Sequence, residues 1–459
     1  MEDPYLLGPY APVDEEIDAT LTVVAGEVPR DLHGTYVRNG PNPKRAAEGL
    51  HHWFDGDAML HAVHVEDGQL RYKNRYVRTP ALAAEDEAGH ALWRGLMESW
   101  SHNPKGQPYK DTGNTDVLLH GGELLTLHYI GGVAHRVDPR SLETLGARAT
   151  PARMSAHAKA DPVTGELLYF DYGPRPTMTY GVTDASGAPL HQTSVALPGP
   201  RLPHDMAFTE RYAILMDLPV WPRPEAAIER KWMVDFHRDT PARFGILPRR
   251  GDGADVRWFE ADPCYVYHAV NAWEDGDAVV LVGCRCDDPI GTPDPADGRL
   301  ATAMANLRLR AHLHRWRFDL ATGACTEEAL DDLNAEFPTM NADFAGRRSR
   351  FGYHVTIPDT RTLRFDGVVK YDDGRRVARH AFGDGVYGSE APFAPRVGAT
   401  EEDDGYLLTF VQDTRAGASE LWIYDARAIE RGPITKARVP ARVPAGFHAT
   451  WAPATGGAS

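Results

Sequence analysis

Clusters of turn-forming residues occur along the whole chain, and this feature restricts its fold more than any other. Short apolar runs of strand length alternate with clusters of Gly, Asp, Pro and Asn, which end helices and strands. Segments 166–171, 212–218, 278–284 and 406–412 each follow such a cluster, and residues 61–77 read as a hairpin around an Asp-Gly turn. The pattern predicts an all-β protein.

The spacing of the strands indicates the kind of β architecture. Strand–turn–strand units recur at intervals of roughly 45 to 65 residues, which is the loose repeat typical of propeller blades. The strongest helical signal is residues 301–311. No low-complexity tract or linker divides the 459 residues. We therefore expect one all-β domain that spans residues 1–459.

Charge and cysteine content limit the classes of function. The formal net charge of −16 argues against a general nucleic-acid binder, which normally presents a basic face. Four cysteines (Cys264, Cys284, Cys286 and Cys325) are too few for a disulfide framework in a chain of this length. The close pair Cys284 and Cys286 is expected to lie in an ordinary strand. A reducing compartment is therefore favoured.

The N-terminal sequence and the lengths of the apolar runs predict the cellular location of the protein. The first residues contain neither a basic region nor an apolar core, so we expect no secretory signal. The longest plainly apolar stretch, residues 278–284, is far shorter than the about 18 residues that a membrane-spanning helix needs. We expect a cytoplasmic protein.

Histidine is the residue type that points to chemistry. The chain has 20 histidines, and it lacks the sequence patterns of nucleophilic hydrolases, zinc proteases and nucleotide-binding loops. His157, His204 and His268 each precede a turn and should begin a strand, whereas His448 lies close to the C-terminus. In a propeller, the innermost strands face the axis, so histidines at equivalent positions would converge there. Imidazole suits iron, copper or zinc.

Eight segments resemble the carotenoid cleavage oxygenase family, from about residue 6 to about residue 452. In chain order they are YVRNGPNP (36–43), HWFDGD (52–57), SAHAK (155–159), PHDMAFTE (203–210), YHAVNAWE (267–274), EFP (336–338), GSEAPF (388–393) and GFH (446–448).

The resemblance implies a fold, a metal and a reaction. The fold would be a seven-bladed β-propeller with loops and short helices that cap an axial metal site. One Fe(II) per chain would be bound by His157, His204, His268 and His448, and no organic cofactor would be needed. The partners would be O2 and a small hydrophobic alkene, which is cleaved to two carbonyl products. Four neutral ligands would leave two coordination positions open for O2 or water beside the substrate.

The resemblance also implies glutamates that orient the ligand imidazoles by accepting their second N–H. Glu336 matches the partner of the third histidine, and Glu390 matches the partner of the fourth. Many relatives carry a third such glutamate, but this chain has Tyr129 or Ile130 at that point. The partner of His204 is therefore left open, with the weaker acceptor Tyr129 as one candidate.

Two substrate classes fit the resemblance. The first is a carotenoid or apocarotenoid, and the alternative is a stilbenoid or phenylpropenoid alkene. Stilbene-cleaving relatives often place a lysine where this chain has His128, so we expect a long polyene with an apolar or aldehyde end to be preferred over a hydroxystilbene. The candidate substrate pocket comprises Phe54, His128, Tyr129 and Phe447.

Two further alternatives concern the surface and the class of protein. A membrane-dwelling substrate would require an apolar surface patch for peripheral membrane contact, and Lys231–Phe236 is one candidate segment. The competing hypothesis from another class is a non-catalytic propeller that binds a partner or an apolar ligand. The iron content of the purified protein distinguishes it from the enzyme.

Overall fold

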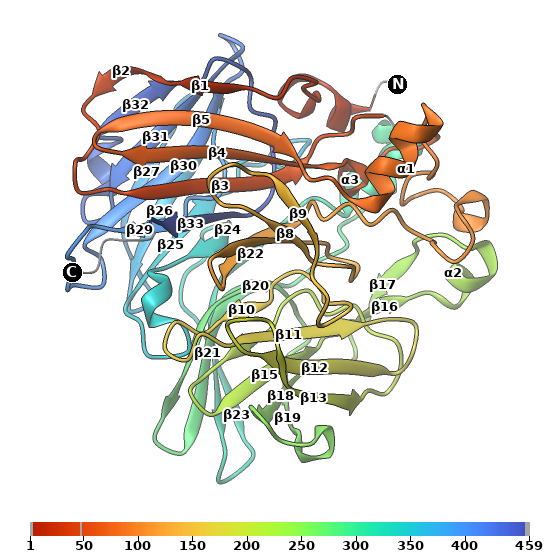
Figure 1. Ribbon diagram of the computed structural model, residues 1–459. Coiled ribbons are helices and arrows are strands. Elements are labelled where there is room, and N and C mark those ends of the chain that lie inside the picture. Colours follow the sequence, from red (N-terminus) through yellow and green to blue (C-terminus); the bar gives the residue numbers. More distant parts are fainter. Residues whose placement is uncertain (1–2, 46–47, 455–459) are drawn as a thin grey trace.

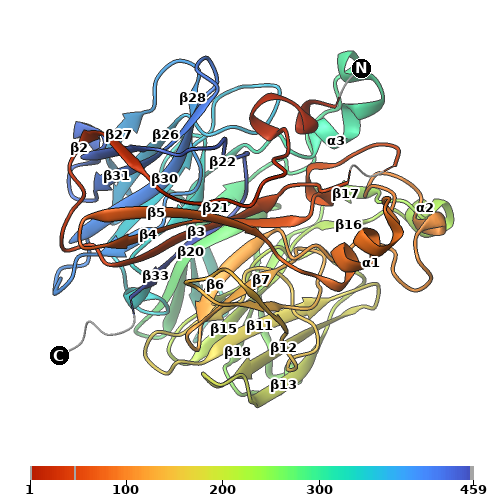
Figure 2. The same ribbon diagram turned by 45° about the horizontal axis from the view of Figure 1, so that its top comes forward.

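The seven large sheets of the protein form a ring of blades (Figures 1 and 2). The computed structural model describes residues 3–45 and 48–454. Each large sheet contains four or more strands, and the pairs within it are antiparallel. The seven-bladed β-propeller that the resemblance implied is therefore confirmed.

Five blades are formed by consecutive stretches of chain, each with four strands. Their strands are β6 (Asp116–His120), β7 (Glu123–Leu127), β8 (His135–Val137) and β9 (Thr144–Ala147); β10 (Lys159–Ala160), β11 (Leu167–Tyr172), β12 (Thr177–Thr183) and β13 (Pro189–Ala196); β14 (Ala207–Phe208), β15 (Tyr212–Asp217), β18 (Ala242–Pro248) and β19 (Arg257–Ala261); β20 (Tyr265–Asp275), β21 (Ala278–Cys286), β22 (Ala311–Asp319) and β23 (Cys325–Ala329); and β24 (Ala335–Thr339), β25 (Phe351–Thr356), β26 (Gly367–Asp372) and β27 (Arg375–Ala381).

The other two blades combine strands from both ends of the chain and so close the ring. One contains β1 (Asp18–Thr20), β5 (Gln69–Tyr76), β4 (Ala58–Glu66), β3 (Gly34–Pro41) and β33 (Ala449–Pro453). The second contains β2 (Thr22–Gly26), β32 (Thr435–Arg438), β31 (Ala418–Asp425), β30 (Gly405–Asp413), β28 (Val386–Tyr387) and β29 (Phe393–Pro395). Because β3 pairs with β33 and β2 with β32, the two ends stabilise each other.

Helices are short and lie outside the blades. The helices α1 (Pro80–Ala88), α2 (Pro224–Glu229) and α3 (Ala301–Ala305) lie on the same side of the ring as the hairpin β16 (Val220–Pro222) and β17 (Val234–Phe236) (Figures 1 and 2). Single 3₁₀ turns occur at Pro4–Leu6, Gly8–Tyr10, Trp53–Asp55, Trp100–His102, Gly253–Asp255, Pro295–Leu300, Ala342–Phe344 and Ile429–Arg431.

The helix expected over residues 301–311 is wrong beyond its first turn. The helix α3 ends at Ala305, and β22 begins at residue 311. Between them Leu307 and Leu309 are buried, whereas Arg308 and Arg310 are less so. The amides of Leu307 and Arg308 still donate to carbonyls three residues earlier, so extended chain begins only after this turn and leads into β22.

The expected strands are otherwise confirmed, and aromatic residues pack the blades together. The hairpin over residues 61–77 is the pair β4–β5. Cys284 and Cys286 both lie in β21 with free thiols. Between two neighbouring blades, Phe244 packs against Trp316 with ring centres 5.2 Å apart, and both are completely buried. Burying one such side chain contributes about 1.5–3 kcal/mol.

Candidate metal centre

Four histidines converge from the innermost strands of four different blades. His157 precedes β10 and His204 precedes β14, as their positions before turns predicted, and His448 precedes β33. His268 differs, because it lies inside β20 rather than at its start. The pairing of β20 with β21 shifts register around His268, between Val266 and Ala269, and such an irregularity can re-aim a side chain.

The four imidazoles form one compact, buried cluster. In five of the pairs, the ring centres lie 4.6 to 5.2 Å apart. Each of His157, His204, His268 and His448 is at most 6% exposed. The first three each offer a nitrogen within 4.8 Å of the others. The fold therefore brings together residues that are up to 291 positions apart in the sequence, from His157 to His448.

The electrostatics of the cluster suit a metal cation. Burial, followed by repulsion between the rings, holds the pKa of His157, His204 and His268 well below its ordinary value, so their lone pairs are available at neutral pH. The buried Nε2 atoms of His157 and His268 have no hydrogen-bond partner within the described residues. A buried polar atom without a partner is costly, and a metal ion would satisfy it. The donor set therefore fits a transition metal.

Two of the imidazoles contact buried glutamates. A carboxylate oxygen of Glu336 lies 2.5 Å from Nδ1 of His268, and one of Glu390 lies 3.1 Å from Nδ1 of His448. Burial raises the pKa of Glu336 to about 8. Burial alone would lower the pKa of His448, but the adjacent Glu390 outweighs it and raises that pKa. A bound dication would favour the ionised carboxylates. The structure thus brings together the histidine–glutamate pairs that the resemblance implied.

A third carboxylate, which the sequence analysis missed, contacts His157. Asp116 opens β6, and one of its oxygens accepts the backbone N–H of His157 at 3.0 Å and lies 3.5 Å from its Nδ1. With Asp116 from β6, Glu336 from β24 and Glu390 just before β29, the innermost strand of each of the seven blades supplies one side chain to the site. Asp116 was overlooked because an Asp at the beginning of a strand resembles an ordinary turn residue.

We expect Asp116→Asn to weaken metal binding without unfolding the protein. The amide oxygen of asparagine can still accept the His157 N–H, whereas the negative charge beside the imidazole is lost. Loss of a carboxylate that supports a ligand typically costs about 10- to 100-fold in metal affinity or activity. Competition titration with Co(II) measures the affinity. Glu123→Gln, a carboxylate in the same blade that pairs with Arg136, is the matched control and should bind metal normally.

His204 is supported by aromatic rings instead of a carboxylate. The rings of Tyr129 and Tyr267 lie 4.4 Å and 5.1 Å from the His204 ring, and the buried Nδ1 of His204 has no hydrogen-bond partner within the described residues. The hydroxyl of Tyr129 lies near Tyr265 instead. Tyr129 therefore packs against His204 and does not accept a hydrogen bond from it.

An ion pair next to His204 links three of the blades that carry the histidines. Asp205, next to His204, lies 2.7 Å from Nζ of Lys159 and accepts the backbone N–H of Ala269 at 2.8 Å. The Asp205 side chain is 1% exposed, and that of Lys159 is 25% exposed. A single carboxylate thus ties together residues of, or next to, β10, β14 and β20, and it fixes the spacing of three histidines.

We expect Asp205→Ala to destabilise the fold. The change leaves Lys159 unpaired and the Ala269 N–H without an acceptor, which should cost about 3 kcal/mol of unfolding free energy. Chemical denaturation of the metal-free protein measures it. Asp332→Asn is the control, because that side chain is 97% exposed and should change stability by less than about 0.5 kcal/mol. Equal stability of the Asp205 and Asp332 variants would contradict the linking role.

Backbone strain also marks the site. His157 has φ +66° and Phe337, next to Glu336, has φ +50°, although neither is glycine. Such conformations are rare for residues with a Cβ and persist only where the surroundings impose them. The strain is consistent with backbone that is held in place to aim His157 and Glu336.

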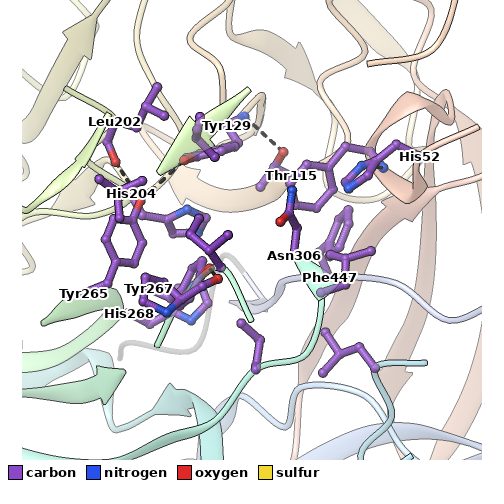
Figure 3. Close-up of a pocket in the computed structure, with 18 of the residues that line it drawn as sticks. His52, Thr115, Tyr129, Leu202, His204, Tyr265, Tyr267, His268, Asn306 and Phe447 are labelled. Carbon is purple, nitrogen blue, oxygen red and sulfur yellow. Dashed lines mark hydrogen bonds between the residues drawn. The ribbon is translucent and has the colours of Figure 1, made fainter. Parts of the chain in front are cut away.

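A largely apolar cavity of about 100 Å³ adjoins the histidines (Figure 3). Phe54, Tyr129 and Phe447 line it, as the sequence analysis expected. His128 is not among the lining residues, although it is buried, so its inclusion in the pocket is corrected. His128 directly follows β7, and Tyr129 lies in the turn that the bond from the Gly131 N–H to the His128 carbonyl closes. Trp232 and Val234 of the segment 231–236 line the cavity as well.

Comparison with known proteins decides the family. The sequence model of a family described as retinal pigment epithelial membrane protein matches residues 10–453. A carotenoid 9,10(9′,10′)-cleavage dioxygenase from Arabidopsis thaliana is 35% identical over 97% of this chain and 89% of its own length. The chain belongs to the carotenoid cleavage oxygenase family. It is therefore an alkene-cleaving dioxygenase, as expected from the sequence.

Other members of the carotenoid cleavage oxygenase family show how wide its chemistry is. An isoeugenol monooxygenase from Pseudomonas nitroreducens is 30% identical over 98% of each chain. The crystal structure of a Pseudomonas brassicacearum lignostilbene dioxygenase is 28% identical, covers 99% of both chains and has a TM-score of 0.88.

In the described part of this chain, no helix has both the length and the apolar character to cross a bilayer.

Proposed function

We propose that this chain is an Fe(II)-dependent dioxygenase with one iron per chain, in a single propeller domain over residues 1–459. The observation that carries the proposal is the cluster of four buried imidazoles, which contains nitrogens without partners and adjoins an apolar cavity. His157, His204, His268 and His448 would hold the iron. When bound, the iron would activate O2 for cleavage of the alkene.

The side chains of the protein would position the substrate and exclude water. Glu336, Glu390 and Asp116 would fix the orientation of the His268, His448 and His157 rings, and Tyr129 would pack against His204. The apolar lining would bind the alkene by the hydrophobic effect and keep the reacting bond dry.

The substrate that we propose is a carotenoid or apocarotenoid, whose conjugated C=C bond is cleaved to two carbonyl products. The similarity to a carotenoid 9,10(9′,10′)-cleavage dioxygenase over nearly the whole chain supports this choice. Peripheral contact with a membrane surface through the segment 231–236 and a cytoplasmic location remain predictions from the sequence.

A stilbenoid or phenylpropenoid alkene is the second candidate. The similarities to an isoeugenol monooxygenase and a lignostilbene dioxygenase support it.

Incubation of the iron-loaded enzyme with carotenoids, apocarotenals and hydroxystilbenes tests the proposal. We expect one of these classes to yield two carbonyl fragments, identified by mass spectrometry, in an O2-dependent reaction. A kcat/KM for resveratrol that exceeds the value for an apocarotenal by about tenfold or more would select the second candidate. Protein that binds no iron and cleaves none of the three classes would refute the proposal and favour the non-catalytic propeller.

A further inference from the structure

Two loops that line the cavity are joined to each other by reciprocal hydrogen bonds. The first loop connects β3 to β4 and supplies His52 and Phe54 to the cavity lining, and the second connects α1 to β6 and supplies Leu96. We call the contact of residues 50–55 with residues 95–98 the cap seam. Neither part of the cap seam lies in a strand, so no sheet hydrogen bonds fix its position.

One carboxylate from each loop bonds the backbone of the other loop. Oδ1 of Asp55 accepts the N–H of Leu96 at 2.8 Å, while its Oδ2 accepts the N–H of His52 in its own loop at 2.7 Å. In the opposite direction, Oε1 of Glu98 accepts the N–H of Leu50 at 2.9 Å. Hydrogen bonds to an ionised acceptor are stronger than those between neutral groups. Asp55 therefore fixes both the shape of the first loop and its distance from the second.

The two backbones meet so closely at the cap seam that one position requires glycine. A Cβ at Gly95 would lie 2.1 Å from the carbonyl oxygen of Leu50 and 2.6 Å from Oδ2 of Asp55. The φ angle of Gly95 is not positive, so this contact, rather than the backbone conformation, excludes a larger residue. The closed cap seam thus has no room for even one additional methyl group.

The first loop also packs against the residue next to a candidate metal ligand. Phe54 lies with its ring centre 4.9 Å from that of Phe447, which directly precedes His448. Figure 3 shows His52 on the same side of the cavity as Phe447. If the cap seam opened, His52 and Phe54 would move away from the substrate, and water could enter beside the metal centre.

We propose that Asp55 and Glu98 are positioning residues that hold the cap seam closed and so keep the side chains of both loops against the bound substrate. The inference rests on the proposed function, because it concerns substrate binding at the same site. Burial, opposed by the two N–H donors and by Lys110 and reinforced by Asp3, raises the pKa of Asp55 to about 7. Tests are therefore performed at about pH 8, where most of Asp55 is ionised.

Hydrogen exchange of the metal-containing enzyme, followed by mass spectrometry, tests the bonds of the cap seam without any substrate. Asp55→Asn leaves one acceptor for two N–H groups, so the amides of His52 and Leu96 should exchange about tenfold faster. Glu98→Ala should accelerate exchange at Leu50 by a similar factor. Unchanged exchange at these amides in both variants would overturn the inference.

A carboxylate elsewhere in the fold is the matched control. Glu402 also accepts two neighbouring backbone N–H groups, those of Arg350 and Phe351, but none of these residues lines the cavity. Glu402→Gln should leave exchange in both loops of the cap seam unchanged. Equal acceleration in Glu402→Gln and Asp55→Asn would show a general loss of stability and would overturn the assignment to the seam.

Steady-state kinetics then distinguishes a positioning role from a merely structural one. With the substrate that the unmodified enzyme cleaves best, Asp55→Asn and Glu98→Ala should raise KM about five- to tenfold and change kcat by less than about threefold, because only the closed cap seam binds substrate well. Gly95→Ala should have the same effect by a steric route, whereas Gly173→Ala, whose added methyl group meets open space, should have none. An unchanged KM in all three seam variants would overturn the inference. Failure of the proposed function would show separately, as absence of cleavage by the unmodified enzyme, and the exchange rates would then decide the inference.

Discussion

Replacing any one of the four histidines with alanine should remove most of the bound metal and abolish alkene cleavage. Changes to groups that only support a ligand cost about 10- to 100-fold, so loss of a direct ligand should exceed about 100-fold in activity. His204→Ala is the most informative variant, because His204 has no carboxylate partner whose rearrangement could complicate the result. Metal content by mass spectrometry and kcat/KM are the two readouts.

A control must show that the effect comes from the loss of a metal ligand and not from the loss of any histidine. His191 lies in the outermost strand of its blade, where its Nε2 contacts the carbonyl of Gly251. His191→Ala should retain its metal and its activity. Full activity in His204→Ala, or equal metal loss in both variants, would contradict the assignment of the ligands.

Glu336→Gln should lower metal affinity or activity by about 10- to 100-fold and leave the enzyme measurably active. Glutamine can still accept the Phe337 N–H that Glu336 now accepts, but it lacks the charge that orients and polarises the His268 ring. Metal titration and kcat/KM measure the change.

Glu390→Gln should behave in the same way through His448, because Glu390 also accepts the backbone N–H of Ala449. Glu274→Gln is the matched control, since Glu274 bonds Thr209 and Arg211 on a turn outside the ring of seven side chains. A structure of the metal-bound enzyme in which Glu336 or Glu390 coordinates the metal directly would refute the orienting role.

The sequence predicted the fold because each strand is bounded by its own local signal. Asp-Gly turns and strand-length apolar runs placed the hairpin β4–β5 and the strands β15, β21 and β30 with small errors at their ends. The prediction for segment 301–311 failed because the helix ends in a turn at Leu307 and Arg308, and Leu307 and Leu309 line the cavity. Tertiary packing there outweighs local propensity.

The supporting carboxylates were harder to predict than the histidines. Glu336, Glu390 and Asp205 lie in motifs that resemble a family, but the sequence does not indicate the partners of Asp205. Asp116 lies in none of these motifs and looks like a turn residue. Their roles depend on contacts between blades, since Asp116 reaches a residue 41 positions away and Asp205 reaches one 64 positions away. Such contacts form only when the blades assemble into the ring, so they cannot be predicted from the local sequence.

The substrate preference drawn from the sequence depended on His128, and its basis changes with the structure. His128 was expected near the substrate in place of a lysine, but its side chain does not line the cavity, whereas that of Tyr129 does. A shift of one residue, at the turn that follows β7, decides which side chain lines the cavity.

Isotope labelling tests the central claim most directly. The iron-loaded enzyme should be supplied with ¹⁸O2 and a cleavable alkene, and the products should be reduced at once so that aldehyde oxygens do not exchange with water. A dioxygenase at the four-histidine centre predicts one ¹⁸O in each of the two carbonyl products, and no product in His204→Ala. Label in only one product, or label-free products formed equally well by His204→Ala, would contradict the account.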